Sequence, residues 1–198
     1  MHSTVEVLME DFGTQGFTTL PIENHGSTLT LSNGAILLCG GIKDMMKCIQ
    51  WEDGIWKEHS TLNVIRVFHS AVVTQTATFL FGGMESTESY EYLSNNSNTW
   101  LMGKTKIPGG FCIGYAIASK DGEKIWLIGG DETEKRILSF NIKEHTFQEL
   151  PAQLNVGRIS HRCAFIPNTN KIMVTGGCNR TNVSRFCLKG LCFLANPS

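Results

Sequence analysis

The feature of this sequence that most constrains its fold is a short apolar stretch that ends in two glycines and occurs four times. The stretches are "LLCGG" at 37–41, "FLFGG" at 79–83, "WLIGG" at 126–130 and "MVTGG" at 173–177. Their second glycines, at 41, 83, 130 and 177, are separated by 42, 47 and 47 residues. A period of this length indicates a repeat architecture. The shorter first interval contains Asp53-Gly54, a tight hairpin signal, where the other units have longer loops.

Each unit has the same internal pattern. An apolar segment, a polar turn and a second apolar segment lead to the glycines, and a third segment and a large aromatic residue follow. Alternation of this kind between turn signals predicts strands, and no stretch has a convincing helical period. The unit is therefore expected to be a four-stranded antiparallel meander of roughly 45 residues. Because one such sheet cannot bury both of its faces, we expect the copies to stack around an axis, as in a propeller.

The glycines and the aromatic residues are predicted to have structural roles. A glycine ends the second strand where sheets crowd together, since it alone tolerates close packing and a positive φ there. The aromatic residue begins the outer strand and can fill the space between neighbouring sheets. The residues given these roles are Gly40, Gly41, Gly82, Gly83, Gly129, Gly130, Gly176, Gly177, Trp56, Trp100 and Phe147.

On these features the chain resembles the kelch-repeat family. The resemblance also includes "RVFHSAVV" from Arg66, "RISHRCAF" from Arg158 and "SNTW" at 97–100, and it extends over residues 3–178. Two features depart from the family pattern. Tyr92-Leu93 and Phe140-Asn141 stand where a tyrosine-aspartate pair is usual, and 108–111 ("PGGF") stands where two other units have an arginine. The resemblance implies an all-β fold, a kelch-type β-propeller.

The repeat divides the chain into three full units and two halves. The leading half is inferred because Phe17-Thr-Thr-Leu-Pro mirrors Phe147-Gln-Glu-Leu-Pro. The expected divisions of the propeller region 1–178 are a half blade at 3–24, blades at 25–65, 66–110 and 111–157, and a half blade at 158–178, followed by an atypical tail at 179–198.

Three arrangements of the ends remain open. The halves could combine into one composite blade and close a four-bladed ring. The tail could supply diverged third and fourth strands, with Phe186 and Phe193 as their aromatic residues. We expect instead an open arc from a longer kelch protein, because a four-bladed ring needs about 90° between blades where the larger rings that this repeat suits need about 60°.

A partner-binding rim is the candidate functional site. In a meander of this topology, the loops after the glycine pairs and the loops entering each first strand emerge on one face. Rigid scaffolds place recognition on such loops, and Met45, Met46 and Met84 add adaptable apolar contacts. The alternative is a solvated rim of mixed charge, with histidines that cap turns and satisfy buried backbone groups. The candidate rim residues are Arg66, His69, Glu85, Glu88, Asp131, Glu132, Arg158 and His161.

Composition excludes several classes of function. With 17 basic and 18 acidic residues the net charge is −1, so no attraction to nucleic acid is expected. The apolar runs are too short to cross a membrane, and the start lacks a signal-peptide pattern. The seven cysteines are odd in number and include no CxxC pair. This argues against a zinc site and a complete disulfide framework, and a cytoplasmic location is expected.

No catalytic, metal or cofactor site is predicted, and the chain is not expected to be an enzyme. It contains no nucleophile elbow and no phosphate-binding loop. A kelch-like copper oxidase would need converging tyrosine and histidine ligands, and only Tyr90, Tyr92 and Tyr115 are present. The resemblance implies the substrate-recognition part of a kelch-like ubiquitin-ligase adaptor, whose BTB region is a separate segment. The alternative is an actin-binding or scaffolding kelch protein. The expected partner is a peptide segment or a cytoskeletal protein, and a small-molecule ligand is not expected.

Overall fold

The computed structural model describes residues 4–8, 14–19, 28–32, 35–131, 133–179, 187–188 and 191–192. Every regular element in these ranges is a β-strand, and they contain no helix. The prediction of an all-β fold is confirmed.

Three four-stranded antiparallel sheets form the body of the molecule, each from four consecutive strands. Sheet I contains β3 (Thr28–Ser32), β4 (Ala35–Cys39), β5 (Lys47–Glu52) and β6 (Ile55–Thr61). Sheet II contains β7 (Ser70–Val73), β8 (Ala77–Phe81), β9 (Tyr90–Ser94) and β10 (Leu101–Met102). Sheet III contains β11 (Tyr115–Ala118), β12 (Lys124–Ile128), β13 (Ile137–Asn141) and β14 (Thr146–Glu149). The four-stranded meanders expected from the repeat are therefore confirmed.

Three further sheets have two strands each. Sheet IV contains β15 (Arg162–Phe165) and β16 (Ile172–Thr175), and the other two pairs are β1 (Thr4–Leu8) with β2 (Thr14–Thr19), and β17 (Cys187–Leu188) with β18 (Leu191–Cys192). No strand pairing joins β1–β2 or β17–β18 to sheet IV in the described parts of the chain. The composite sheet considered above is therefore not formed there. Phe186 and Phe193 lie outside the described residues.

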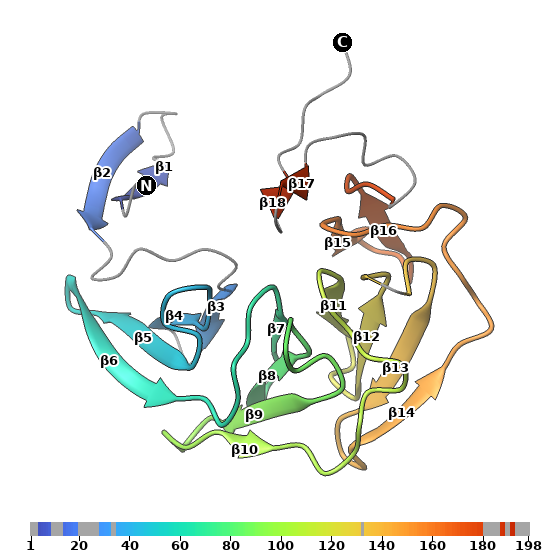
Figure 1. The fold of residues 1–198 in the computed structure, drawn as a ribbon, viewed down its shortest axis with the longest axis horizontal. Helices are drawn as coiled ribbons and strands as arrows, with labels where there is room; N and C mark the ends of the chain where they lie inside the picture. Colours follow the sequence, from blue (N-terminus) through green and yellow to red (C-terminus); the bar gives the residue numbers. More distant parts are fainter. Residues whose placement is uncertain are drawn as a thin grey trace.

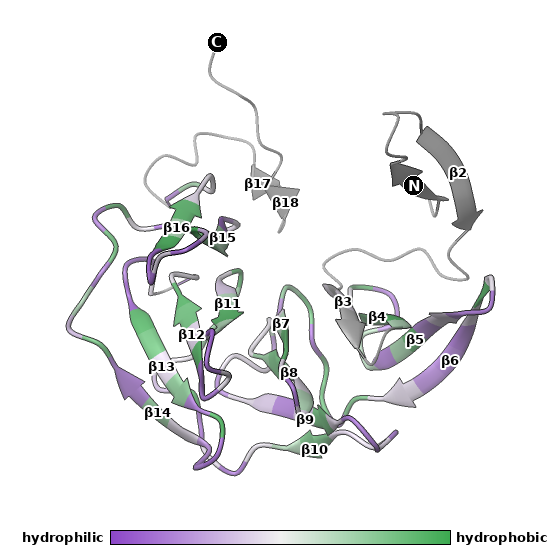
Figure 2. Ribbon diagram, turned by 180° about the vertical axis from the view of Figure 1, so that it is seen from behind, coloured by the Kyte–Doolittle hydropathy of each residue, from purple (hydrophilic) through white to green (hydrophobic). Residues whose placement is uncertain are grey.

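Sheets I to IV follow one another around an arc, with the first strand of each on the inner side (Figure 1). The inner strands β3, β7, β11 and β15 contact one another in that order. The β1–β2 pair and sheet IV lie at the two ends of the arc (Figure 1). Figure 2 shows hydrophobic residues along β8, β12 and β16 and hydrophilic residues along the outer strands β6 and β14.

Both faces of sheet II are buried, each against a neighbouring sheet. On one face of sheet II, Leu80 and Trp100 pack with Leu37 of sheet I. On the other face, Phe79 and Phe81 pack with Phe140 of sheet III, at ring-centroid distances of 5.7 and 5.3 Å. All five residues of β8 are buried as a result. Alternate side chains of one strand thus belong to two different cores, which explains why the second strands have continuous apolar sequences.

The predicted aromatic residues lie in different environments. Trp100 is buried between sheets I and II, and Phe147 packs against Tyr90 and Phe81 of the preceding sheet. Trp56 instead packs on Trp51 of its own sheet, with ring centroids 5.4 Å apart. The turn between β5 and β6 is at Asp53-Gly54, where both residues have positive φ, as the hairpin signal indicated.

The glycine pairs join each sheet to the next by a repeated backbone contact, which we call the glycine joint. The second glycine donates its N–H to a carbonyl of the segment that leads into the next sheet. The three bonds are Gly41 to Arg66 (2.9 Å), Gly83 to Phe111 (3.0 Å) and Gly130 to Arg158 (3.0 Å). Because the same bond recurs with nearly the same length, it sets a constant relation between neighbouring sheets.

The first glycine of each pair lies so close to that carbonyl that no side chain fits. A Cβ added at Gly40, Gly82 or Gly129 would collide with the carbonyl oxygen of the next segment, and each has a positive φ of 60–65°. Gly176 has a similar φ of +69°, but an added Cβ would meet no described residue within 4 Å. Within the part of the chain that the structure describes, the fourth pair therefore has the backbone conformation of a glycine joint with no further sheet packed against Gly176.

We expect the two kinds of glycine to respond differently to substitution. Gly82→Ala introduces both the strain of a positive φ and a collision with Phe111, so it should lower the free energy of unfolding by about 3 kcal/mol or more. Gly176→Ala introduces the strain alone and should cost about 1 kcal/mol. Chemical denaturation of both variants measures the difference. Equal losses would contradict the assignment of the glycine joint to sheet packing.

Candidate partner-binding site

The loops after the glycine pairs and the segments that lead into the next inner strands lie together along one edge of the arc. Val67 pairs with Met84, and Ile159 pairs with Cys178, each in an isolated antiparallel bridge. The glycine joints hold the same loops against each other. We call this edge the rim, and its central part consists of the loop 84–88, the segment 109–112 and Asp131.

Arg66 does not lie on the exposed surface of the rim, and the prediction that it does is wrong. Its side chain is fully buried. The guanidinium donates from Nε to Glu91 Oε1 at 2.9 Å, and from Nη1 to the carbonyl oxygens of Gly82 (2.7 Å) and Ser89 (3.1 Å). Its Nη2 donates to Ser89 Oγ at 3.0 Å. The arginine is buried because its own sheet accepts its donors, including a carboxylate that neutralises its charge.

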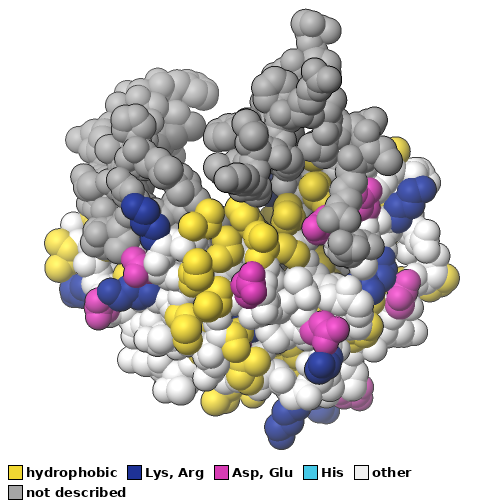
Figure 3. Space-filling model, in the orientation of Figure 1, with side chains coloured by type: hydrophobic (Ala, Val, Ile, Leu, Met, Phe, Trp, Pro, Cys, Tyr) yellow, Lys and Arg dark blue, Asp and Glu magenta, His cyan; other side chains and the backbone are white. Residues whose placement is uncertain are grey.

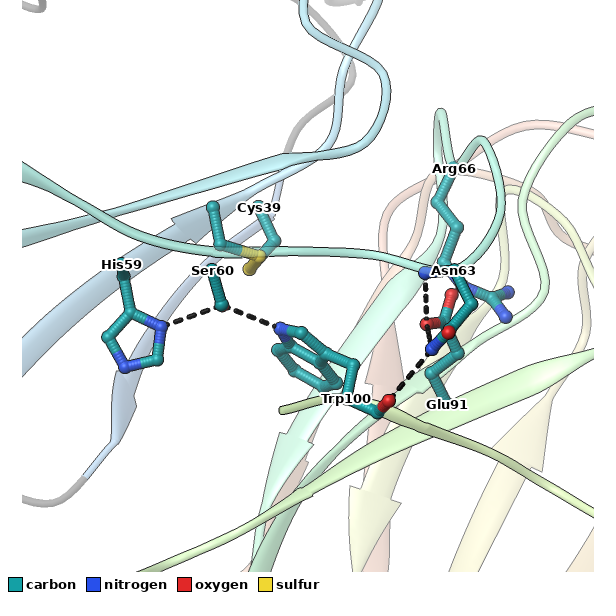
Figure 4. The surroundings of a disulfide bond; sticks show 8 residues. Cys39, His59, Ser60, Asn63, Arg66, Glu91 and Trp100 are labelled. Atoms are coloured by element: carbon teal, nitrogen blue, oxygen red, sulfur yellow. Dashed lines mark hydrogen bonds and ion pairs between the residues drawn. A yellow bond between two sulfur atoms is a disulfide. The ribbon is translucent and has the colours of Figure 1, made fainter. Parts of the chain in front are cut away.

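Glu91 is the essential partner that the sequence reasoning missed. Its Oε2 accepts from both the backbone N–H and the side-chain amide of Asn63, at 2.7 Å each. The Asn63 amide also donates to the carbonyl of Trp100 at 2.8 Å (Figure 4). A charged residue at a buried position of β9 carries little signal alone. A usable signal is that the segment 62–66 ("LNVIR") recurs at 154–158 ("LNVGR").

A second polar chain lies beside this ion pair. Trp100 Nε1 donates to Ser60 Oγ at 2.9 Å, and that hydroxyl is 2.7 Å from His59 Nδ1 (Figure 4). Next to it, Cys39 and Cys48 form a disulfide between β4 and β5. Cys39 and Cys48 lie opposite each other in sheet I, as Phe81 and Tyr90 do at the equivalent positions of sheet II. The disulfide of sheet I thus stands where sheet II has a pair of aromatic rings.

The disulfide bears on the predicted location. Cys112, Cys163 and Cys178 are free, so the described cysteines form no complete disulfide framework. Disulfides are nevertheless rare in the cytosol, so the Cys39–Cys48 bond does not match the reducing compartment expected from the cysteine count. The described residues contain no helix long and apolar enough to cross a membrane. A cytoplasmic location therefore stays a prediction.

His69 and His161 are also buried, so their placement on a partner-binding rim is wrong. Burial, together with the charge of Arg66, lowers the pKa of His69 to about 3. Burial likewise lowers the pKa of His161 to about 4, with contributions from Arg158 and Arg162. Both rings are therefore neutral at pH 7. They occupy equivalent positions, three residues after an arginine, and each follows a residue with positive φ, Phe68 or Ser160.

The remaining rim candidates are accessible or lie outside the described structure. Glu85 and Glu88 are exposed, and Glu88 pairs with Lys106 at 2.9 Å. Asp131 and Arg158 are half-buried. Glu132 lies outside the described residues. The rim loops also expose apolar side chains, namely Ile42, Met45, Ile65 and Met84.

The loop 84–88 separates two hollows of the rim. The larger, of about 600 Å³, lies between this loop and residues 102–106. The smaller, of about 290 Å³, lies between the loop and residues 109–112, with Asp131 at its side. Glu85 lines both, and its φ of 68° is rarely adopted by residues other than glycine.

The smaller hollow contains one cysteine, Cys112. Cys112 lines the smaller hollow, where burial and the nearby Asp131 raise its pKa to about 12. Its thiol is therefore protonated at neutral pH and unsuited to nucleophilic attack. Within the described residues, no three His, Cys, Asp or Glu side chains are placed to hold a metal ion. The larger hollow is lined by Lys104 and Lys106 as well as by Glu85 and Glu88, whereas the charged side chains that line the smaller hollow are Glu85 and Asp131.

Comparisons with known proteins give a likeness of fold. No family model matches the chain, and no curated protein matches it. Among solved structures, that of YjhT is similar with a TM-score of 0.61 and 13% sequence identity. The match covers 72% of this chain and 56% of YjhT, so this chain spans little more than half the length of that structure. At this identity the likeness concerns the fold alone.

The burial of Arg66 can be tested by comparing its substitution with that of Arg158, the equivalent residue of the next copy of the segment. Arg66→Ala leaves Glu91 as a buried charge without its cation, so we expect a loss of about 3–5 kcal/mol in the free energy of unfolding. Arg158→Ala, at the half-exposed counterpart, should cost less than about 1 kcal/mol. Urea denaturation distinguishes these values. A small effect of Arg66→Ala would mean that the arginine is exposed in solution.

The buried histidines should make stability depend on pH. Their pKa values are lower in the folded than in the unfolded protein, so the unfolded chain binds more protons below about pH 6.5. Stability is then complete above pH 6.5 and falls as the pH decreases, by about 2 kcal/mol per histidine at pH 5. Denaturation at pH 7 and pH 5 measures this loss. The His69→Gln and His161→Gln variants should each reduce it, and an unchanged loss in both would contradict the assignment.

Proposed function

We propose that the chain is a kelch-type β-propeller module that binds a protein partner through the rim, as the substrate-recognition part of a ubiquitin-ligase adaptor. The glycine joint and the arc of sheets support the propeller assignment, because a constant relation between sheets is what a radial repeat requires. The adaptor role follows from the resemblance to kelch-like proteins and needs a BTB region on a separate segment.

The loop 84–88 is the observation that carries the rim proposal. Glu85 is held in a strained conformation between two hollows, beside the exposed Met84. Backbone strain in an exposed loop is frequently found where a protein binds its ligands. Figure 3 shows hydrophobic side chains gathered on one face of the molecule with isolated acidic side chains among them, a surface composition suited to protein contact.

The loop is rigid enough to present Glu85 in one orientation. Ser86 N–H donates to the Gly83 carbonyl at 3.2 Å, and Ser89 N–H donates to the Ser86 carbonyl at 3.0 Å. Ser89 Oγ donates to the same carbonyl of Ser86 and accepts from Arg66. The buried Arg66 therefore supports the loop from below. Such preorganisation reduces the entropy lost when a partner binds.

The burial of Arg66 also defines the chemistry of the partner. With this cation withdrawn, the charged groups that line the smaller hollow are Glu85 and Asp131. The partner that fits is an extended segment with a basic residue for these carboxylates and an apolar residue for Met84. Contacts of this kind are typical of peptide recognition by loops on a rigid scaffold.

Charge reversal on the rim tests the proposal. The intact chain, the double variant Glu85→Lys/Asp131→Lys and the control Glu123→Lys/Glu144→Lys serve as baits in cell extract, and a partner that is captured is then purified and titrated. The control charges are on the hairpins at the opposite edge of sheet III. We expect the rim variant to weaken binding at least about tenfold and the control to leave it unchanged. Equal affinity of all three proteins would refute rim binding.

A further inference from the structure

The disulfide of sheet I lies at the base of a rim loop. Cys39 ends β4, Cys48 lies in β5, and the loop 42–47 between them exposes Ile42 and Met45. Because the two cysteines are only nine residues apart in the sequence, their bond closes the loop into a small covalent ring. The conformation of this part of the rim therefore depends on the redox state of the two sulfurs.

The ring is the surface on which the next sheet docks. Three hydrogen bonds join it to the segment 62–66, which leads into sheet II. They run from Leu62 N–H to the Met46 carbonyl (2.7 Å), from Arg66 N–H to the Met45 carbonyl (3.0 Å) and from Gly41 N–H to the Arg66 carbonyl (2.9 Å). The third bond is the glycine joint between sheets I and II. A change in the ring is thus transmitted directly to the segment 62–66.

The segment 62–66 in turn holds the loop 84–88. The Arg66 guanidinium donates to the Gly82 carbonyl at 2.7 Å and to Ser89 Oγ at 3.0 Å, on either side of that loop. The Ser89 hydroxyl donates to the Ser86 carbonyl within the loop at 3.0 Å. A continuous series of contacts therefore connects the disulfide to the loop that presents Glu85.

The disulfide is buried beneath the docked segment. Cys39 and Cys48 are 2% and 0% exposed, and they belong to a hydrophobic cluster with Leu62 and Trp100 (Figure 4). Met46, which forms the first docking bond with Leu62, packs against the same cluster. A reductant can reach the sulfurs only when this region opens locally, so reduction and docking involve the same contacts.

The other four-stranded sheets hold the same loop base without a covalent bond. The positions of the two cysteines are occupied by Phe81 and Tyr90 in sheet II and by Ile128 and Ile137 in sheet III. Side-chain packing is therefore sufficient for the meander, and sheet I can persist when its disulfide is reduced. Two thiols fill less space than either of the other pairs, so they hold the loop base less firmly than the disulfide does.

The predicted location favours a reversible bond. Disulfides that do occur in the cytosol are usually transient, with a catalytic or a redox-sensing role. A catalytic disulfide needs an accessible sulfur, whereas Cys39 and Cys48 are both buried. A redox-sensing role is therefore the one that reconciles this disulfide with the cytoplasmic location expected from the sequence.

We propose that the Cys39–Cys48 disulfide is a redox switch that regulates partner binding at the rim. In the oxidised state, the covalent ring holds the segment 62–66 and, through Arg66, the loop 84–88. Reduction leaves sheet I folded but loosens the docking bonds. The inference rests on the proposed function of the rim for its effect on binding.

The reductant is a dithiol. One of its thiolates attacks a sulfur of the disulfide and forms a mixed disulfide, and its second thiol then releases the protein. Two electrons and two protons pass to Cys39 and Cys48, which become thiols, and the dithiol is oxidised to a disulfide. Reoxidation by a disulfide reverses both steps.

Amide hydrogen exchange followed by NMR tests the switch without a partner. The intact chain is compared with and without about 10 mM dithiothreitol, and differential alkylation with mass spectrometry records the state of Cys39 and Cys48. In the reduced protein, exchange should be at least about fivefold faster at the docking amides, those of Gly41, Leu62 and Arg66. The equivalent amides of Gly130, Leu154 and Arg158 belong to a loop base without cysteines, and their exchange should change less than about twofold.

The double variant Cys39→Ala/Cys48→Ala is the matched control. It cannot form the bond, so its docking amides should exchange fast both with and without dithiothreitol. The partner purified in the rim experiment is then titrated, and it should bind the reduced protein at least about fivefold more weakly than the oxidised one.

Three results would overturn the proposal. They are a disulfide that persists in the folded protein in dithiothreitol, equal exchange of the docking amides in both redox states, and equal affinity of both states for the partner. Because the exchange measurement needs no partner, a failure of the switch is distinguished from a failure of rim binding.

Discussion

The glycine joint is the contact on which the rest of the structure depends. Each joint consists of one hydrogen bond, from a glycine N–H to a carbonyl of the next leading segment, and of a close approach that excludes any side chain. The joint brings neighbouring sheets close together, so that alternate side chains of β8 pack against sheet I on one face and against sheet III on the other. It also brings the loops together along one edge, because the donor ends one sheet and the acceptor begins the next. The packing between sheets and the position of the rim thus have a common origin.

The ion pair of Arg66 and Glu91 adds a polar connection to this apolar framework. It joins the leading segment of sheet II to β9 and, through Asn63, to the carbonyl of Trp100. Replacing such a pair by apolar residues is often neutral, so its value is better sought in specificity than in net stability. In sheet III, Phe111 and Leu138 occupy the same positions. The fold therefore accepts either an ion pair or an apolar pair there. In sheet II, Arg66 also bonds Ser89, which holds the loop 84–88, and its own charge is withdrawn from the rim by Glu91.

Sheet IV has parts of these contacts. Gly176 has the conformation of a glycine joint, and Arg158 has the anchoring bond of Arg66, but no described residue packs against the first or forms an ion pair with the second.

The sequence by itself determined the class of fold, because four glycine pairs at nearly constant spacing and alternating apolar segments permit only a repeated β-meander. It also determined the turn at Asp53-Gly54, where local chemistry is sufficient. Only the tertiary structure decided which charged residues are buried and which are exposed. Arg66 and Arg158 occur in almost the same sequence, yet one is buried and the other half-exposed. The difference depends on Glu91, 25 residues away along the chain, whereas no described strand of sheet IV places a carboxylate on Arg158. Burial of a charge is decided by what lies opposite it in space, and local sequence does not contain that information.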